Sequence, residues 1–213
     1  MKKGQRKALL WTTAYAELLT RGKVGGIGVQ MMFWAKALKN NGWQVYSLYE
    51  KTDPEKTDDC IFLKDKETHS STFLLYLFFA FKLLLKVRPE LVLCRGGRNR
   101  NLFFIALWCR ILGIKLVQLF GSDADMQNDI KDLQRNVRLN IKLFRWGLKL
   151  TKYFVAQNKK QQKQLNQQFK NKQLIIIPNI WDSSTKNKTP KKDLILWVGN
   201  TRKLRGCLKT IVN

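Results

Sequence analysis

Short apolar runs alternate with longer segments of helical character along most of the chain. The runs are rich in β-forming residues and span positions 8–11, 45–49, 91–94, 115–120, 153–156 and 174–177. Each run is followed by a segment long enough to form a helix. Repeated alternation of strand and helix is typical of a parallel sheet flanked by helices. The pattern therefore predicts an α/β fold.

Two helices stand out within this pattern. The first presents apolar side chains on one face and ends at Asn41-Gly42, with the apolar positions Met31, Trp34, Ala35 and Leu38. The second, over residues 72–86, is apolar on nearly every side and ends before Arg88-Pro89. It is shorter than the ~20 residues that cross a bilayer, and Lys82 and Lys86 interrupt it. We therefore expect no transmembrane span.

Residues 128–150 carry two neighbouring stripes at helical spacing, one apolar and one basic. The basic stripe consists of Lys131, Arg135, Arg138, Lys142, Arg145 and Lys149. Together with Trp146, it is typical of a helix that lies in the interface of an anionic membrane. A solvated helix face is the alternative interpretation of the same stripe.

The chain changes character near its C-terminal end. Residues 1–182 are expected to form one Rossmann-like domain, and the polar, lysine-rich residues 183–193 a linker. Residues 194–213 begin with a new apolar run, but fewer than the ~40 residues of a marginal domain follow. They are therefore expected to be the start of an incomplete second domain.

The strong positive charge of the chain favours anionic partners. Lys and Arg number 40 against 15 Asp and Glu, which gives a formal net charge of +25, and half of the basic residues lie from Lys131 onward. Anionic lipid and nucleic acid both attract such a chain. No known nucleic-acid-binding signature is present, so the membrane is the preferred partner.

Cysteine and histidine usage argues against metal chemistry. Cys60, Cys94, Cys109 and Cys207 are far apart and form no CxxC pair, and His69 is the single histidine. We expect no metal, no cofactor and no Cys/His catalytic pair. A reducing cytoplasm is the simplest location for four such cysteines.

Three loops carry candidate binding residues. Gly25 and Gly26 open the first long helix, where bare N–H groups favour a phosphate, although a simple tight turn explains them equally well. Gly121, Ser122 and Asp123 follow the fourth apolar run at its C-terminal end, the side on which α/β sheets bind ligands. Asp123 is the candidate catalytic residue, and helix capping is its alternative role. Residues 94–100, with three arginines and two glycines, suit phosphate contact or form a solvated basic loop.

Taken in order, these motifs resemble family 4 of the retaining glycosyltransferases. The resemblance spans nearly the whole chain, and its most specific part is Ile177-Pro178-Asn179 with Asp182, followed by a linker and a strand ending in Val198-Gly199. Members of this family have the GT-B fold, in which two Rossmann-like domains face each other across a cleft. The chain is thus expected to be the N-terminal half of such a fold.

The resemblance also implies an activity and roles for individual residues. It implies transfer from a nucleotide sugar, without a metal, to a glycan or lipid-linked acceptor of the cell envelope, at the inner face of the membrane. Gly25, Gly26, Gly121, Ser122 and Asn179 would lie toward the substrates, and Arg202 and Arg205 toward the donor phosphates. The paired glutamates of the family would fall beyond Asn213, so the chain alone is expected to transfer little. A noncatalytic remnant of a transferase and a basic membrane- or nucleic-acid-binding protein are the alternatives, with nucleic acid the less favoured partner.

Overall fold

The computed structural model describes residues 5–21, 26–49, 58, 60–64, 73–95, 98–126 and 135–179. Several predictions lie outside these residues: the roles of Gly25, Lys131, Arg202 and Arg205, the linker over 183–193, and the second domain over 194–213. The side chain of Arg135 is also outside the described part.

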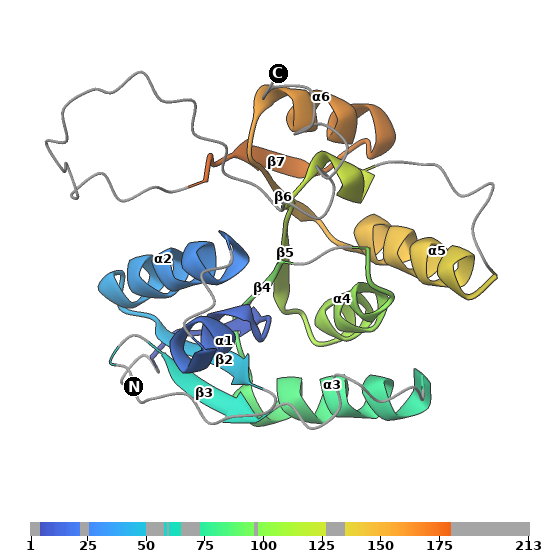
Figure 1. The fold of residues 1–213 in the computed structure, drawn as a ribbon. Helices are drawn as coiled ribbons and strands as arrows, with labels where there is room; N and C mark the ends of the chain where they lie inside the picture. The colour runs from blue at the N-terminus through green and yellow to red at the C-terminus, as the bar shows by residue number, and fades with distance from the viewer. Residues whose placement is uncertain are drawn as a thin grey trace, which may run out of the picture. The chain divides into compact units, whose positions relative to one another are not determined.

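All strands of the described part join one parallel sheet (Figure 1). Its order is β3-β2-β1-β4-β5-β6-β7. The strands are β1 (Lys7–Trp11), β2 (Gln44–Tyr49), β3 (Ile61–Lys64), β4 (Leu91–Arg95), β5 (Lys115–Leu119), β6 (Tyr153–Ala156) and β7 (Gln173–Ile176). Six of the seven strands coincide with the apolar runs of the sequence. The parallel α/β sheet predicted from those runs is confirmed.

Helices connect the strands. They are α1 (Ala14–Arg21), α2 (Gly26–Asn40), α3 (Phe73–Val87), α4 (Asn101–Ile111), α5 (Arg135–Leu150) and α6 (Lys159–Gln168), with a short 3-10 helix η1 (Asp123–Met126). The pattern predicted α2 well, because Met31 and Ala35 are fully buried and Gly42 adopts a φ of 78° just beyond the helix. The apolar helix expected over 72–86 is α3.

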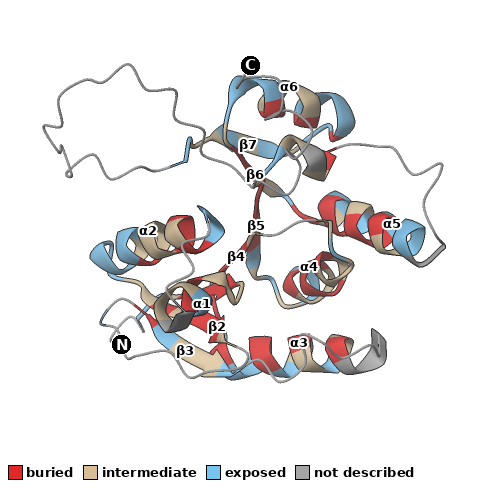
Figure 2. Cartoon of the chain, viewed as in Figure 1, coloured by how far each residue is buried: buried red, intermediate tan, exposed pale blue. Residues whose placement is uncertain are grey.

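The helices cover both faces of the sheet (Figures 1 and 2). On one face, α1 and α2 pack against the sheet through Tyr15, Met31 and Ala35. On the other face, α3, α4, α5 and α6 pack through side chains that include Ala80, Phe104, Phe144 and Leu165. Apolar residues therefore alternate between two cores along each central strand, as both sides of a parallel sheet are covered.

Two glycines permit close packing of these helices. A Cβ at Gly147 of α5 would lie 2.8 Å from the backbone nitrogen of Phe103 in α4. A Cβ at Gly28 of α2 would lie 2.6 Å from the carbonyl oxygen of Ala14 in α1. Real Cβ atoms do not approach backbone atoms this closely, so both sites require glycine. Gly28 thus has a packing role within the glycine-rich segment that opens α2.

The order of the strands reverses at β1. Strand β1 pairs with β2 on one side and with β4 on the other, and the two halves of the sheet grow outward from there. Neighbouring connections leave β1 and β4 in opposite directions at their C-terminal ends. In open α/β sheets this switch point is where ligands bind.

Candidate functional site

A cavity of about 190 Å³ lies at the switch point. Its lining includes Trp11 at the end of β1, Cys94 at the end of β4 and Gln118 of β5. Helices α3, α4 and α5 complete the walls with Tyr76, Leu102, Ile105 and Phe144. With Leu48 of β2, the cavity draws on seven elements that are far apart in the sequence.

The wall of the cavity is aromatic and fixed in place. The indole N–H of Trp11 donates a hydrogen bond of 2.9 Å to the hydroxyl of Tyr76, and both residues are buried. The Tyr76 ring also lies 6.2 Å from that of Phe104, at an interplanar angle of 58°. Because the polar tips of Trp11 and Tyr76 satisfy each other, the wall presents its rings to the cavity at little cost.

The rim of the cavity is polar. It includes Thr12, Thr13, Asn99 and Asn101. Thr12 Oγ1 accepts a hydrogen bond of 3.2 Å from the backbone nitrogen of Ala14, and Asn99 Oδ1 accepts one of 3.0 Å from the backbone nitrogen of Asn101. These contacts fix the starts of α1 and α4 beside the opening. An apolar wall with a few placed polar groups is the usual make-up of a small-molecule site.

Arg95 lies beside two of the residues predicted from the sequence, Asn179 and Gly121. Its Nη2 donates to Asn179 Oδ1 at 3.4 Å, and its Nε lies 3.8 Å from where a Cβ of Gly121 would be. Asp125 Oδ2 accepts hydrogen bonds of 3.1 Å from the backbone nitrogens of Gly121 and Ser122. The ends of β4, β5 and β7 therefore meet around one guanidinium group.

The surroundings of Arg95 disfavour the charged form of its side chain. Burial lowers the pKa of the guanidinium from its ordinary value, and the nearby carboxylate of Asp125 partly counteracts this. The Nε atom is buried without a hydrogen-bond partner in the described part of the chain. Arg95 also lines the cavity. The sequence had indicated this residue only through the composition of the 94–100 loop.

Asp123 faces helix α6. Its carboxylate accepts hydrogen bonds from Lys160 Nζ at 2.8 Å and from Gln161 Nε2 at 3.2 Å. These two hydrogen bonds lower the pKa of Asp123, so the carboxylate is ionised at neutral pH. It is Asp125, rather than Ser122 or Asp123, whose side chain accepts from the turn after β5. The catalytic role of Asp123 stays a prediction.

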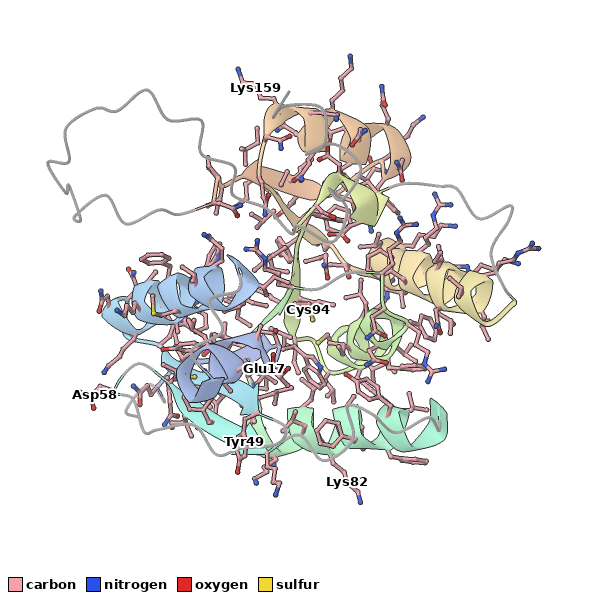
Figure 3. The ribbon with its side chains drawn as sticks, in the orientation of Figure 1. Glu17, Tyr49, Asp58, Lys82, Cys94 and Lys159 are labelled. Carbon is pink, nitrogen blue, oxygen red and sulfur yellow. The ribbon has the colours of Figure 1, made fainter. Side chains whose placement is uncertain are left out.

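Burial disfavours the thiolate form of the two cysteines Cys94 and Cys109. Burial raises the pKa of Cys94 well above its ordinary value, with a further contribution from Cys109, and burial raises that of Cys109 to about 12. The thiolate form that would react is therefore scarce at neutral pH. Cys94, which is labelled in Figure 3, is a buried residue of β4. Among the described residues, no group of three or more His, Cys, Asp or Glu side chains could hold a metal ion.

The other predicted residues are widely spread. Gly26 is the first residue of α2, with open space where its Cβ would be. Arg138, Lys142 and Lys149 are exposed on α5, whereas Arg145 is partly buried. The described helices include none that is long and apolar enough to span a membrane.

The outer surface of α3, α4 and α5 combines basic and apolar side chains. Exposed apolar residues include Phe78 on α3, Ile111 on α4, and Leu139 and Trp146 on α5. The three helices contain no Asp or Glu, and Figure 3 shows Lys82 pointing away from α3. We call this surface the α3–α5 face.

Comparison with solved structures identifies the fold. The chain is similar to sucrose-phosphate synthase from Thermosynechococcus elongatus, with a TM-score of 0.56 and 15% identity over 82% of this chain and 48% of that one. It is also similar to a glycosyltransferase from Rickettsia africae, with a TM-score of 0.53 and 13% identity over 82% and 43% of the two chains. A third similar structure is UDP-GlcNAc 2-epimerase from Neisseria meningitidis bound to UDP-GlcNAc, with a TM-score of 0.50 and 12% identity over 80% and 44%.

These matches define a class of fold. The chain has a Rossmann-like α/β fold that matches solved GT-B enzymes and spans less than half of their length. The fold predicted from the sequence is therefore confirmed. No family model matches the sequence. No curated protein matches it.

Proposed function

We propose that the chain is the acceptor-side part of a glycosyltransferase that uses a nucleotide-sugar donor. The observation that carries this proposal is the cavity at the switch point between β1 and β4, with its aromatic wall and polar rim. Rings of Trp11 and Tyr76 suit contact with a sugar, and the amides of Asn99 and Asn101 suit its hydroxyl groups. The similarity of the fold to a solved glycosyltransferase supports the same class of reaction.

The finer parts of the proposal follow the resemblance to family 4. The reaction would retain the configuration of the sugar and need no metal. Gly25, Gly26, Gly121, Ser122 and Asn179 would lie toward the substrates, and Arg202 and Arg205 would neutralise the donor diphosphate. Asp123 is the proposed catalytic carboxylate, and its low pKa supports the ionised form that such a role requires.

A transfer assay on the natural protein tests this proposal. Protein isolated from its source cells is incubated with radiolabelled UDP-glucose, UDP-N-acetylglucosamine or GDP-mannose and a lipid extract of the same cells. We expect label from one donor to enter the lipid or glycan fraction, with EDTA having no effect. Absence of transfer from every donor, with the protein still folded, would overturn the proposal.

A matched pair of variants connects transfer to the cavity. Asn99→Trp places a large ring at the rim, whereas Asn40→Trp places the same ring at the exposed end of α2. We expect transfer to fall at least tenfold in the first variant, and to be unchanged in the second. Equal activities would show that sugar does not enter this cavity.

The proposal includes a lipid-linked acceptor and a place at the inner face of an anionic membrane. The α3–α5 face supports it, because basic side chains attract anionic headgroups while exposed Trp146 and Leu139, 56% and 53% exposed, can enter the interface. Each basic residue near such a surface contributes ~1 kcal/mol of attraction.

Vesicle flotation tests this placement. The chain is mixed with phosphatidylglycerol vesicles or with phosphatidylcholine vesicles, and binding to the first is expected to be far stronger. Reversing Arg138, Lys142 and Lys149 to Glu should release the chain. The control reverses the equally exposed Lys159, Lys163 and Lys170 on and beside α6, and should bind nearly as wild type. Equal loss in both variants would indicate unspecific charge attraction, of the kind that also binds duplex DNA.

A further inference from the structure

Arg95 carries an unbalanced charge at the edge of the cavity. Within the described residues it forms no ion pair, and its one hydrogen bond goes to the neutral amide of Asn179, at a long 3.4 Å. The carboxylate of Asp125 partly counteracts the effect of burial on the pKa of Arg95. It already accepts hydrogen bonds from the backbone nitrogens of Gly121 and Ser122. A guanidinium has five donors and no acceptor. Most of its donating capacity is therefore not used by carboxylates of this part of the chain.

Such an arrangement has an energetic cost. A charge moved out of water loses hydration, and this loss is recovered only when an anion or several acceptors take its place. The Nε atom of Arg95 is buried without a hydrogen-bond partner in the described part of the chain, and burial lowers the pKa of the guanidinium. An oxyanion brought by a ligand would supply the missing acceptors, and phosphate or carboxylate matches the planar fork of arginine.

The position of Arg95 indicates which ligand would bring that oxyanion. Arg95 lies in the lining of the cavity, next to the aromatic wall of Trp11 and Tyr76 and the amides of Asn99 and Asn101. We propose that the sugar acceptor is anionic and that Arg95 binds its phosphate or carboxylate group, while the cavity holds the sugar ring. This inference rests on the proposed function, because the cavity is taken as the acceptor site.

The neighbouring charges favour the same class of ligand. Arg98 and Arg100 follow Arg95 in the loop before α4. Clustered positive charges raise the local concentration of anionic ligands. Asn179, which Arg95 contacts, precedes the predicted linker. An anion at Arg95 would thus lie where the acceptor-side domain ends.

Calorimetric titration of the full chain tests the inference. The probes are glucose 1-phosphate, glucuronate, uncharged glucose and UDP. We expect glucose 1-phosphate or glucuronate to bind at least tenfold more tightly than glucose, which corresponds to the strength of a charged hydrogen bond. Arg95→Gln should remove this preference, so that the anionic sugars bind no more tightly than glucose.

The control for total charge is Arg110→Gln, which removes an exposed arginine from the last turn of α4. This variant should keep the preference for the anionic sugars. Equal weakening in both variants would overturn the proposal, since it would reflect the net charge of +25 alone. A response of UDP, without any response of the two anionic sugars, would assign Arg95 to the donor and would also overturn it.

Stability measurements separate binding from folding. Because Arg95→Gln removes a partly desolvated charge, the variant is expected to melt at or above the temperature of the wild type. A lower melting temperature, with all four probes weakened in parallel, would give Arg95 a structural role instead. Binding is measured without transfer. If the natural protein transfers no sugar but the chain still prefers anionic sugars, the proposed reaction fails and Arg95 remains a binding site for anionic sugars.

Discussion

Two basic regions of this protein differ in their exposure to water. Arg95 is partly buried beside a cavity, and its Nε atom has no partner in the described structure. The stripe on α5 presents Arg138, Lys142 and Lys149 to solvent. A basic side chain in water is screened by salt and interacts with many different anions. A basic side chain that is removed from water needs an anion in a defined position. The same residue types therefore predict a surface attraction in one region and a specific contact in the other.

Helix α5 connects the two regions. Its outer side carries the exposed basic stripe, while its inner side contributes Phe144 to the lining of the cavity. If the α3–α5 face lies on a membrane, the cavity is held at a fixed distance from the lipid headgroups. Both regions therefore depend on the packing of the inner side of α5 against the core.

Phe144→Ala should give the largest effect. The ring is 2% exposed and contacts the core on the α4 side of the sheet, so its removal is expected to lower the free energy of unfolding by about 3–5 kcal/mol. Urea denaturation measures the loss. The control Leu139→Ala, on the outer side of the same helix at 53% exposure, should change it by no more than ~0.5 kcal/mol. Similar losses in both variants would mean that α5 is not held by its inner side.

Gly147→Ala should give the next effect. The new Cβ would meet backbone atoms of Leu102 and Phe103 at 2.9 and 2.8 Å, so α5 must move away from α4. Overpacking of this kind typically costs about 1–3 kcal/mol, which exceeds the better helix propensity of alanine. Thermal unfolding would record it, and Lys142→Ala serves as the control on the exposed side. A gain in stability would contradict the close approach of the two helices.

Binding at the two regions should differ in its dependence on salt, which can be measured on the wild type. Raising NaCl from about 50 to about 200 mM is expected to weaken vesicle binding at least tenfold, because exposed charges are screened. The preference for glucose 1-phosphate over glucose at Arg95 should fall by less than about threefold, since partly buried pairs are screened less. Flotation measures vesicle binding and calorimetry measures the preference for glucose 1-phosphate, both at the same salt concentrations. If both fall by the same factor as salt rises, the two regions do not differ in screening.

Asp123→Asn should give the smallest effect, and one that depends on pH. Hydrogen bonds from Lys160 and Gln161 lower the pKa of Asp123 in the folded chain. Its contribution to stability is therefore present above the ordinary aspartate pKa of about 3.9 and is lost as the pH falls through the lower, folded value. Wild type and variant should differ slightly in urea denaturation near neutral pH and converge in acid. A difference that grows on acidification would contradict this sign.

The parts of the fold that could be predicted are those with a local cause. Helix α2 followed from the spacing of Met31, Ala35 and Leu38 and from the glycine stop at Gly42. Strand β3 was not predicted, because it is a four-residue edge strand whose Ile61 is 45% exposed and whose sequence shows no alternation. Edge position alone is not the reason, because β7 at the other edge was predicted from its apolar run.

The site was harder to predict because its contacts are distant in sequence. No local pattern indicates that Trp11, Tyr76 and Phe144 line one cavity, since β1, α3 and α5 meet only in the folded chain. The turn after β5 contains both Asp123 and Asp125, and only the structure shows that Asp125 accepts from Gly121 while Asp123 faces α6. Arg95 was visible as part of a basic loop, but its burial was not.

The place of β1 in the middle of the sheet has a consequence for synthesis of the protein on the ribosome. Strand β1 leaves the ribosome well before β4, yet Leu9 pairs with Val92 of β4. Until β4 is made, the apolar residues Leu9 and Leu10, both fully buried in the folded protein, lie in a strand with one open edge. Nascent chains that stop before β4 therefore expose a strand edge on which aggregation can start.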